Sequence, residues 1–229
     1  MAGLTIRGGM AGMGGGILCL SSSPTIRDNR IEENSGTWGG GIACFAGSAP
    51  LVVGNDIVGN STLYSPYFAK LGGGVFCELS SPVLERNVIA FNESHEYGGG
   101  IACNINSSPI LRNNTLARNT APTGDGLLAW SGSHPTLVNC ILWEDSGTIS
   151  DCCGASSAAS YSDVAGGWPG TGNLDADPHF LDASAGDFRL ASDSPCIDTG
   201  DPASPLDPDG TVADIGALPF TQAARLGKR

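Results

Sequence analysis

Apolar and polar residues alternate in short stretches along the first 145 residues, and Gly, Pro and Asn separate these stretches. Alternation of this kind is typical of short β-strands, whereas a helix repeats its apolar positions every three to four residues. The stretches also recur as a set. Glycine triplets or near-triplets begin at residues 14, 39, 72, 98 and 124, and each opens a unit reading GGG-I-x-C, a Ser-rich turn, Pro and x-I-x-x-N-x-I-x-x-N.

Aligned units give columns of one residue type, as stacked coils of a solenoid would. An apolar column is followed two residues on by a mostly thiol column, namely Ile17, Ile42, Val75, Ile101 and Leu127, then Cys19, Cys44, Cys77, Cys103 and Ala129. Two asparagine columns are Asn29, Asn55, Asn87 and Asn114, and Asn34, Asn60, Asn92 and Asn119, the second closed by Asp145. Coils stack at the strand-pairing distance of about 4.8 Å. We therefore expect an apolar core bordered by asparagine ladders.

These motifs resemble a known family. The unit GGG-I-x-C with its asparagines is similar to the right-handed parallel β-helix repeat of pectate-lyase-like bacterial surface and secreted proteins, and Phe91-Asn92 resembles repeats of polymorphic outer-membrane adhesins. The resemblance implies an all-β, right-handed parallel β-helix, a single-stranded solenoid of about six coils. We expect repeats over residues 1–147, terminal coils with an irregular acidic C-terminal cap over 148–220, and a tail over 221–229.

The opening residues 3–9 align with the second half of a coil. We therefore expect the natural protein to carry further coils before them, within a longer precursor. The resemblance implies a secreted or cell-surface protein whose signal peptide lies outside this fragment.

The charge of the chain limits the classes of partner that it is expected to bind. The chain has 11 basic and 23 acidic side chains, a net charge of −12, and 34 glycines among 229 residues. Residues 150–220 hold twelve Asp, a single Arg and no Lys. Nucleic-acid affinity comes largely from Lys and Arg, so nucleic acid is not expected as a partner. No apolar run approaches the about 20 residues that span a bilayer, so we expect no membrane insertion.

The cysteines fall into two groups. The four in the thiol column predict small, buried, unpaired side chains, because apolar residues alternate with them in that column. Outside this column, the adjacent Cys152 and Cys153 could pair only through a strained ring, so we expect a disulfide from one of them to Cys140 or Cys196.

No catalytic residues are assigned. The chain contains no nucleophile elbow, zinc-protease motif, phosphate-binding loop or dinucleotide fingerprint. Its three histidines share no column, and no pair of carboxylates has the placement that glycosidases need.

Aromatic residues precede the glycine triplets and suggest a binding surface. We assign Trp38, Tyr64, Tyr67 and Tyr97 as candidate carbohydrate-binding residues, because flat rings with polar rims suit sugars. A polysaccharide or cell-surface glycan is the expected partner. The alternative is that the long loop over 61–71 folds back over its own apolar groups.

The acidic tail contains a candidate calcium site at Asp207, Asp209 and Asp214, where oxygen ligands alternate around Gly210. Asp-Pro and Asp-Gly pairs also form ordinary turns, which is the alternative. Ca²⁺ is the only cofactor expected.

The outer face of the GGG-I-x-C strand is also apolar, with Phe76 and Trp130 in its columns. We expect the stretch Leu174–Phe220 to cover this face, because its Phe180 and Phe188 otherwise lack a core. A second protomer or a ligand is the alternative. The sequence thus predicts a noncatalytic extracellular module, glycan-binding or adhesive. The alternative is a polysaccharide lyase or glycoside hydrolase whose active site lies partly in preceding coils.

Overall fold

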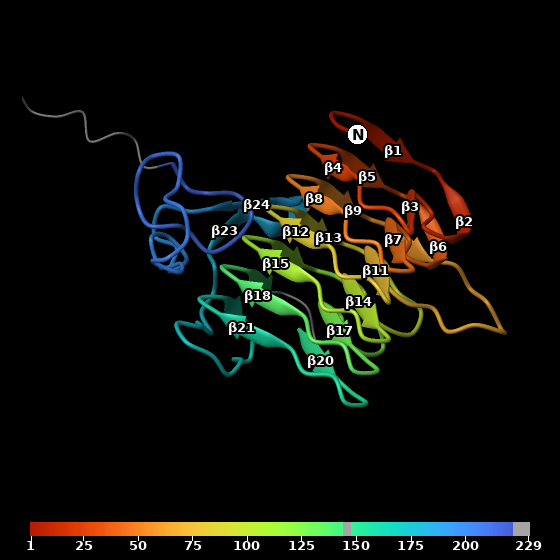
Figure 1. Ribbon diagram of the computed structural model, residues 1–229. Coiled ribbons are helices and arrows are strands. Elements are labelled where there is room, and N and C mark those ends of the chain that lie inside the picture. Colours follow the sequence, from red (N-terminus) through yellow and green to blue (C-terminus); the bar gives the residue numbers. More distant parts are fainter. Residues whose placement is uncertain (144–147, 222–229) are drawn as a thin grey trace, which may run out of the picture.

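The computed structural model describes residues 1–143 and 148–221, in which the chain winds into a solenoid of short parallel strands (Figure 1). The first sheet follows the glycine triplets and contains β3 (Ile17–Leu20), β7 (Ile42–Phe45), β11 (Val75–Glu78), β14 (Ile101–Asn104), β17 (Leu127–Ala129) and β20 (Ile149–Asp151). The second contains β4 (Thr25–Arg27), β8 (Leu51–Val53), β12 (Val83–Glu85), β15 (Ile110–Arg112), β18 (Thr136–Val138) and β21 (Ala158–Ser160). The third contains β1 (Thr5–Arg7), β5 (Arg30–Glu32), β9 (Asp56–Val58), β13 (Val88–Ala90), β16 (Thr115–Ala117), β19 (Ile141–Trp143) and β22 (Asp163–Val164).

A small fourth sheet lies at the corner before the first sheet and pairs β2 (Met10–Met13), β6 (Ser35–Trp38) and β10 (Ser61–Thr62). Pairing within all four sheets is parallel, and its register follows the sequence columns. Cys44 pairs with Cys77 and Cys77 with Cys103, one coil apart each time. The predicted all-β parallel solenoid of about six coils is confirmed.

The core runs along the solenoid axis between the three sheets. It contains the apolar columns and the thiol column, in which Ala129 and the free cysteines Cys19, Cys44, Cys77 and Cys103 are all buried. Ile101 is fully buried, whereas Ile17 in the first complete coil is half-buried. The inward face was therefore correctly predicted, because strand side chains alternate between the two faces.

The asparagine ladders satisfy polar groups where the chain turns between sheets. Asn60 donates from Nδ2 to the carbonyl oxygen of Ile31 (2.8 Å) and to Oδ1 of Asn92 (3.0 Å), while its own Oδ1 accepts from the backbone N–H of Asn34 (3.1 Å). Buried amides need such partners. Asp145, predicted to close this ladder, lies outside the described residues.

The last coil is closed by residues that follow it. Trp168 packs against the core, and Asn173 continues the ladder chemistry by accepting from the backbone N–H of Ser162 (3.0 Å) and donating to the carbonyl oxygen of Ala159 (3.0 Å). Strands β20, β21 and β22 belong to the same three sheets and come after residues 144–147 in the chain. The proposed boundary at residue 147 and residues 222–229 of the predicted tail lie outside the described residues.

The C-terminal segment returns along the side of the solenoid (Figure 1). It contains an antiparallel pair, β23 (Phe180–Asp182) and β24 (Asp187–Leu190), joined by the 3-10 helix η1 (Ala183–Ala185). Two apolar clusters join it to the outer face of the third sheet: Phe188 and Ala217 with Val88, Ala90 and Ala117, and Leu190, Cys196 and Ile215 with Ile141.

This position corrects the prediction that Leu174–Phe220 covers the first sheet. The outer face of the third sheet offers small apolar side chains such as Ala90 and Ala117, on which Phe188 fits closely. The first sheet is already covered by aromatic residues from its own turns, as described below. An apolar face is buried by whichever segment can reach it in the right geometry, and sequence distance alone does not identify that segment.

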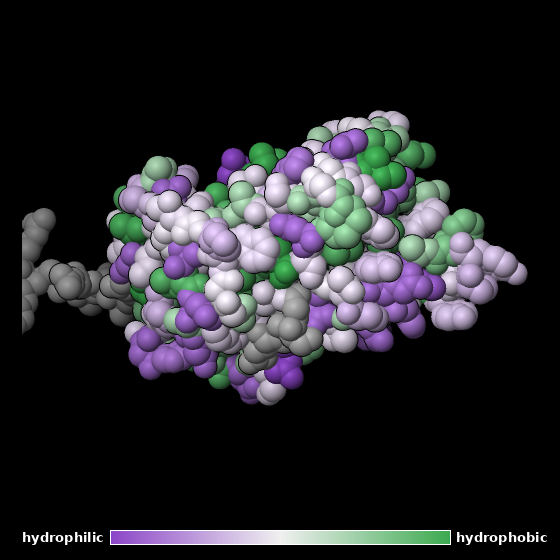
Figure 2. All heavy atoms as spheres, turned by 90° about the horizontal axis from the view of Figure 1, so that it is seen from below, coloured by the Kyte–Doolittle hydropathy of each residue, from purple (hydrophilic) through white to green (hydrophobic). Residues whose placement is uncertain are grey.

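Polar contacts also anchor the segment. The guanidinium of Arg86 pairs with the buried carboxylate of Asp207 at 3.3 Å, and Thr115 Oγ1 accepts from the backbone N–H of Ala217 (3.0 Å). On the face seen in Figure 2, hydrophobic and hydrophilic residues are interspersed. No helix among the described residues has the length and apolar character to cross a membrane.

Candidate functional site

The glycine triplets turn the chain sharply into each strand of the first sheet. Their first glycine has a positive φ, +73° at Gly39 and +72° at Gly72. At the second position, a Cβ on Gly40 would lie 2.4 Å from the carbonyl oxygens of Gly73 and Ser61. Only glycine fits where two backbones pass so closely. The residue before each triplet is therefore held at a fixed place beside the first sheet.

Residues before the triplets form an outward column of Trp38, Leu71, Tyr97 and Thr123, joined by parallel bridges. Trp38 and Tyr97 pack over a cluster on the outer face of the first sheet, in which Phe45 and Phe76 are buried. We call Trp38, Phe45, Phe76, Tyr97 and Trp130 the aromatic surface.

Ring contacts run along this aromatic surface. The ring centroids of Phe45 and Phe76 are 5.4 Å apart, Trp38 lies 6.2 Å from Phe45, and Tyr97 lies 5.2 Å from Trp130. Edge-to-face and tilted pairs at these distances are favourable. The prediction that rings from successive turns gather on one edge is confirmed for Trp38 and Tyr97.

The loop over residues 63–71 projects from the solenoid beside the aromatic surface (Figure 1). Two contacts hold its C-terminal part. Trp38 donates from Nε1 to the carbonyl oxygen of Ala69 (2.8 Å), and the largely buried Lys70 ammonium pairs with Glu96. The hydrogen bond from Lys70 lowers the pKa of the Glu96 carboxyl, with the charge of Lys70 adding to the effect.

The two predicted tyrosines of this loop point into solvent. Tyr64 is 75% exposed and Tyr67 is 86% exposed, and the Lys70 ammonium lies 5.4 Å from the Tyr64 ring centroid. The structure therefore places Trp38 and Tyr97 half-buried on the aromatic surface and leaves Tyr64 and Tyr67 on the adjacent loop.

A groove of about 310 Å³ crosses the aromatic surface and is lined by Trp38, Ala69, Leu71, Glu78, Asn104, Ile105, Trp130 and Ser131. Its polar groups come from neighbouring strands, where Asn104 donates from Nδ2 to Oε2 of Glu78 (3.3 Å). Sequence reasoning did not assign Glu78, Asn104 or Trp130 to the site. The available signal was their shared outward column, in which a carboxylate, an amide and an indole follow one another.

A second hollow of about 410 Å³ lies between the third sheet and the C-terminal segment. Its two arginines already have carboxylate partners. Arg30 pairs with Asp56 (3.2 Å), and Arg189 pairs with Asp187. An anion entering this hollow would have to compete with those carboxylates.

The candidate calcium residues take part in hydrogen bonds that shape the C-terminal turns. Besides its pair with Arg86, Asp207 accepts from the backbone N–H of Asp214 (2.6 Å). Asp209 accepts from the backbone N–H and the hydroxyl of Thr211 (3.2 and 2.8 Å). These are the turn contacts of the alternative interpretation.

Asp214 is buried and accepts from the backbone N–H groups of Asp198 (2.7 Å) and Phe220 (2.6 Å). Burial raises the pKa of its carboxyl to about 6, against the opposing effect of these hydrogen bonds. Within residues 1–143 and 148–221, no group of three or more His, Cys, Asp or Glu side chains is arranged to hold a metal ion. Calcium binding stays a prediction.

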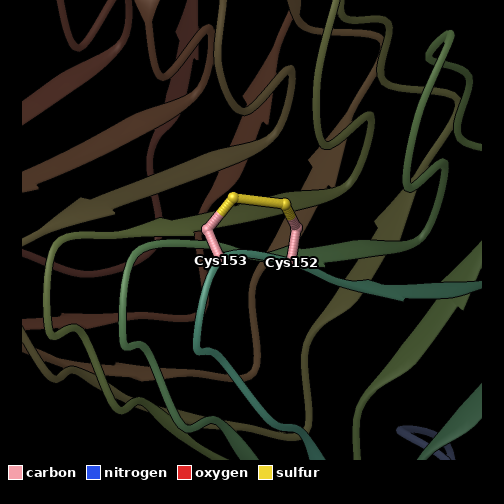
Figure 3. The surroundings of a disulfide bond; sticks show 2 residues. All are labelled: Cys152 and Cys153. Carbon is pink, nitrogen blue, oxygen red and sulfur yellow. A yellow bond between two sulfur atoms is a disulfide. The ribbon is translucent and has the colours of Figure 1, made fainter.

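The cysteines outside the thiol column differ from expectation. A disulfide joins the neighbours Cys152 and Cys153 (Figure 3), whereas Cys140 and Cys196 are buried free thiols. The predicted link to Cys140 or Cys196 is wrong. Cys140 lies inside the core, and Cys196 donates from Sγ to the buried carboxylate of Asp163 (3.3 Å), so neither faces the exposed pair.

The comparisons agree with this architecture. A family model described as the right-handed beta helix region matches residues 5–142, which is more than half of the chain. No curated protein and no solved structure matches the chain. The matched range holds the five glycine-led units and the strands that they form. The chain therefore belongs to the right-handed β-helix family.

Proposed function

We propose that this chain is a noncatalytic extracellular β-helix module that binds a glycan on its aromatic surface. The observation that carries the proposal is the groove lined by Trp38 and Trp130 together with Glu78 and Asn104. Ring faces and hydrogen-bonding groups occur together there, on a rigid sheet.

The chemistry of a sugar ring fits this combination. Its C–H faces pack on indole and phenol rings, and its hydroxyls need both donors and acceptors. Trp38 and Trp130 provide the ring faces, Glu78 accepts hydrogen bonds, and the amide of Asn104 can both donate and accept. The exposed Tyr64 and Tyr67 on the adjoining loop would extend this contact along a longer polymer.

The extracellular part of the proposal is supported by the exposed disulfide between Cys152 and Cys153, since disulfides persist in oxidising compartments. The net charge of −12 also disfavours nucleic acid as the partner.

The test is a glycan-array screen of the full chain, followed by titration calorimetry with the best glycan. Trp130→Ala should weaken binding about 5- to 150-fold, because about 1–3 kcal/mol of ring contact would be lost. Trp143→Ala is the matched control, because Trp143 lies on the third sheet next to the C-terminal segment and should bind as the wild type does.

Two results would contradict the proposal. Equal weakening by Trp143→Ala and Trp130→Ala would place binding elsewhere or reflect lost folding, which circular dichroism would identify. Release of unsaturated or reducing-end products from the bound glycan would make the chain a lyase or hydrolase instead of a noncatalytic module.

A further inference from the structure

The eight cysteines of this chain, all within the described residues, differ sharply in access to solvent. Six are buried free thiols, and the other two form the exposed pair Cys152–Cys153. Burial raises the pKa of the Cys140 and Cys196 thiols, and a hydrogen bond with Cys77 together with burial raises that of Cys44, which keeps these thiols protonated and unreactive. Reagents in solution therefore have access to cysteine sulfur at the Cys152–Cys153 pair and not at the six buried thiols.

The bonded pair lies in a turn that has its own hydrogen bonds. After β20, the Cys152 carbonyl accepts from the backbone N–H of Ala155 (3.1 Å), and the carboxylate of Asp151 accepts from the backbone N–H of Ser157 (2.7 Å). The space around Gly154 is open, since a Cβ there would meet nothing within 4 Å. Figure 3 shows the two sulfur atoms on this turn.

The bond closes no loop of the chain. Cys152 and Cys153 are adjacent, with Cα atoms 3.8 Å apart, whereas a disulfide stabilises mainly by restricting a long loop in the unfolded chain. Because the turn is also held by backbone contacts, the solenoid does not depend on this bond. A disulfide that is exposed and structurally dispensable is suited to reversible reduction.

We propose that Cys152–Cys153 is a surface redox site that exchanges with dithiol reductants while the solenoid stays folded. A thiolate of the dithiol attacks one sulfur of the pair, the S–S bond breaks, and the released cysteine thiolate takes a proton. The second thiol of the reagent then attacks the mixed disulfide. The protein gains two hydrogens as two thiols, and the dithiol becomes its own disulfide.

The test treats the folded, full-length chain with dithiothreitol, removes the reductant, and adds iodoacetamide before intact-mass and peptide analysis. We expect no labelling before reduction, and two labels on the Cys152–Cys153 peptide after it. The melting temperature should shift by less than about 2 °C on reduction.

Two variants serve as controls. The double substitution Cys152→Ser with Cys153→Ser should abolish native labelling, whereas Cys103→Ala should retain it, since Ala129 already occupies the same column one coil away. Labelling of the pair without reduction would overturn the proposal, because the sulfurs would then be free thiols. A requirement for denaturant, or loss of the folded circular-dichroism spectrum on reduction, would equally overturn it.

Discussion

Single asparagines hold neighbouring coils of this solenoid in register. Asn92 donates from Nδ2 to the carbonyl oxygen of Ile57 (2.9 Å) and to Oδ1 of Asn119 (3.0 Å), and its own Oδ1 accepts from Nδ2 of Asn60 (3.0 Å). Each residue thereby bridges three coils. Leaving such a buried group unpaired costs about 1–3 kcal/mol, so the ladder strongly disfavours a slip in coil register.

At the same scale, the buried carboxyl of Asp214 makes stability depend on pH. Its pKa is raised from 3.8 to about 6 in the folded chain, so the folded state favours the protonated form. This stabilisation is fully present below about pH 3.8 and is lost as the pH rises through 6. Between pH 7 and 4, we expect the wild type to gain about 2 kcal/mol relative to Asp214→Asn, which does not titrate.

Chemical unfolding of both proteins at several pH values measures this difference. Other carboxyls act in the opposite direction. The pKa of Glu96 is lowered, so its protonation destabilises the fold as the pH falls. This effect is the same in both proteins and therefore drops out of the difference between them. Parallel pH profiles for the two proteins would show that Asp214 does not titrate in this range.

Calcium binding at Asp207, Asp209 and Asp214 can be tested by mass action. A ligand that binds only the folded state raises the melting temperature as its concentration increases. Because Asp207 would have to give up part of its contact with Arg86, we expect a rise only at millimolar Ca²⁺. Asp209→Asn should remove this rise in melting temperature. Equal melting temperatures of the wild type in Ca²⁺ and in EDTA would contradict calcium binding and mean that these residues only shape the turns.

At the scale of elements, the glycine triplets determine how closely successive coils stack. The second glycine of a triplet faces the backbone of the next coil. The space at its Cα holds a hydrogen atom but is too small for a Cβ. At Gly73 a Cβ would lie 2.6 Å from the carbonyl oxygens of Glu93 and Gly99. Rigid backbone atoms cannot move aside as a flexible side chain can.

This close approach predicts a large effect of a single methyl group. Gly73→Ala should lower the free energy of unfolding by about 3 kcal/mol, within the usual range for overpacking. Gly12→Ala is the matched control, because a Cβ there meets nothing within 4 Å, and it should change stability by less than about 0.5 kcal/mol. Urea unfolding measures both, and similar values for the two variants would contradict the packing argument.

At the scale of the whole molecule, the C-terminal segment and the solenoid form one structure. The side chains of Phe188, Leu190 and Ile215 are buried against strands that precede them by about fifty to a hundred residues. Without this segment, the apolar outer face of the third sheet would be exposed to water. Large exposed apolar patches favour association between protein molecules.

Removal of one buried ring tests this coupling. Phe188→Ala should lower the free energy of unfolding by about 3–5 kcal/mol, because it leaves a cavity between the segment and the third sheet. Tyr67→Ala removes a ring that is 86% exposed and should have little effect. Hydrogen exchange in Phe188→Ala should rise in β13 and β16 as well as in β24, and a rise confined to β24 would mean that the segment folds independently.

From the sequence alone we predicted coils of two or three short strands, the inward columns and the asparagine ladders. These features depend on local alternation and turn residues, and each recurs in every unit, so the repeats confirm one another. The same pattern placed two of the four candidate carbohydrate-binding residues beside the first sheet, because Trp38 and Tyr97 hold fixed places relative to the triplets. Their binding of carbohydrate stays a prediction.

Tertiary contacts set which face the C-terminal segment covers, which cysteines pair and which residues line the groove. Ala217 meets Thr115 across about a hundred residues, and Arg86 meets Asp207 across more. These contacts are not repeated from coil to coil, so the repeat pattern of the sequence does not indicate them. They follow from shape and from the burial of apolar area, which depend on the folded arrangement of the whole chain.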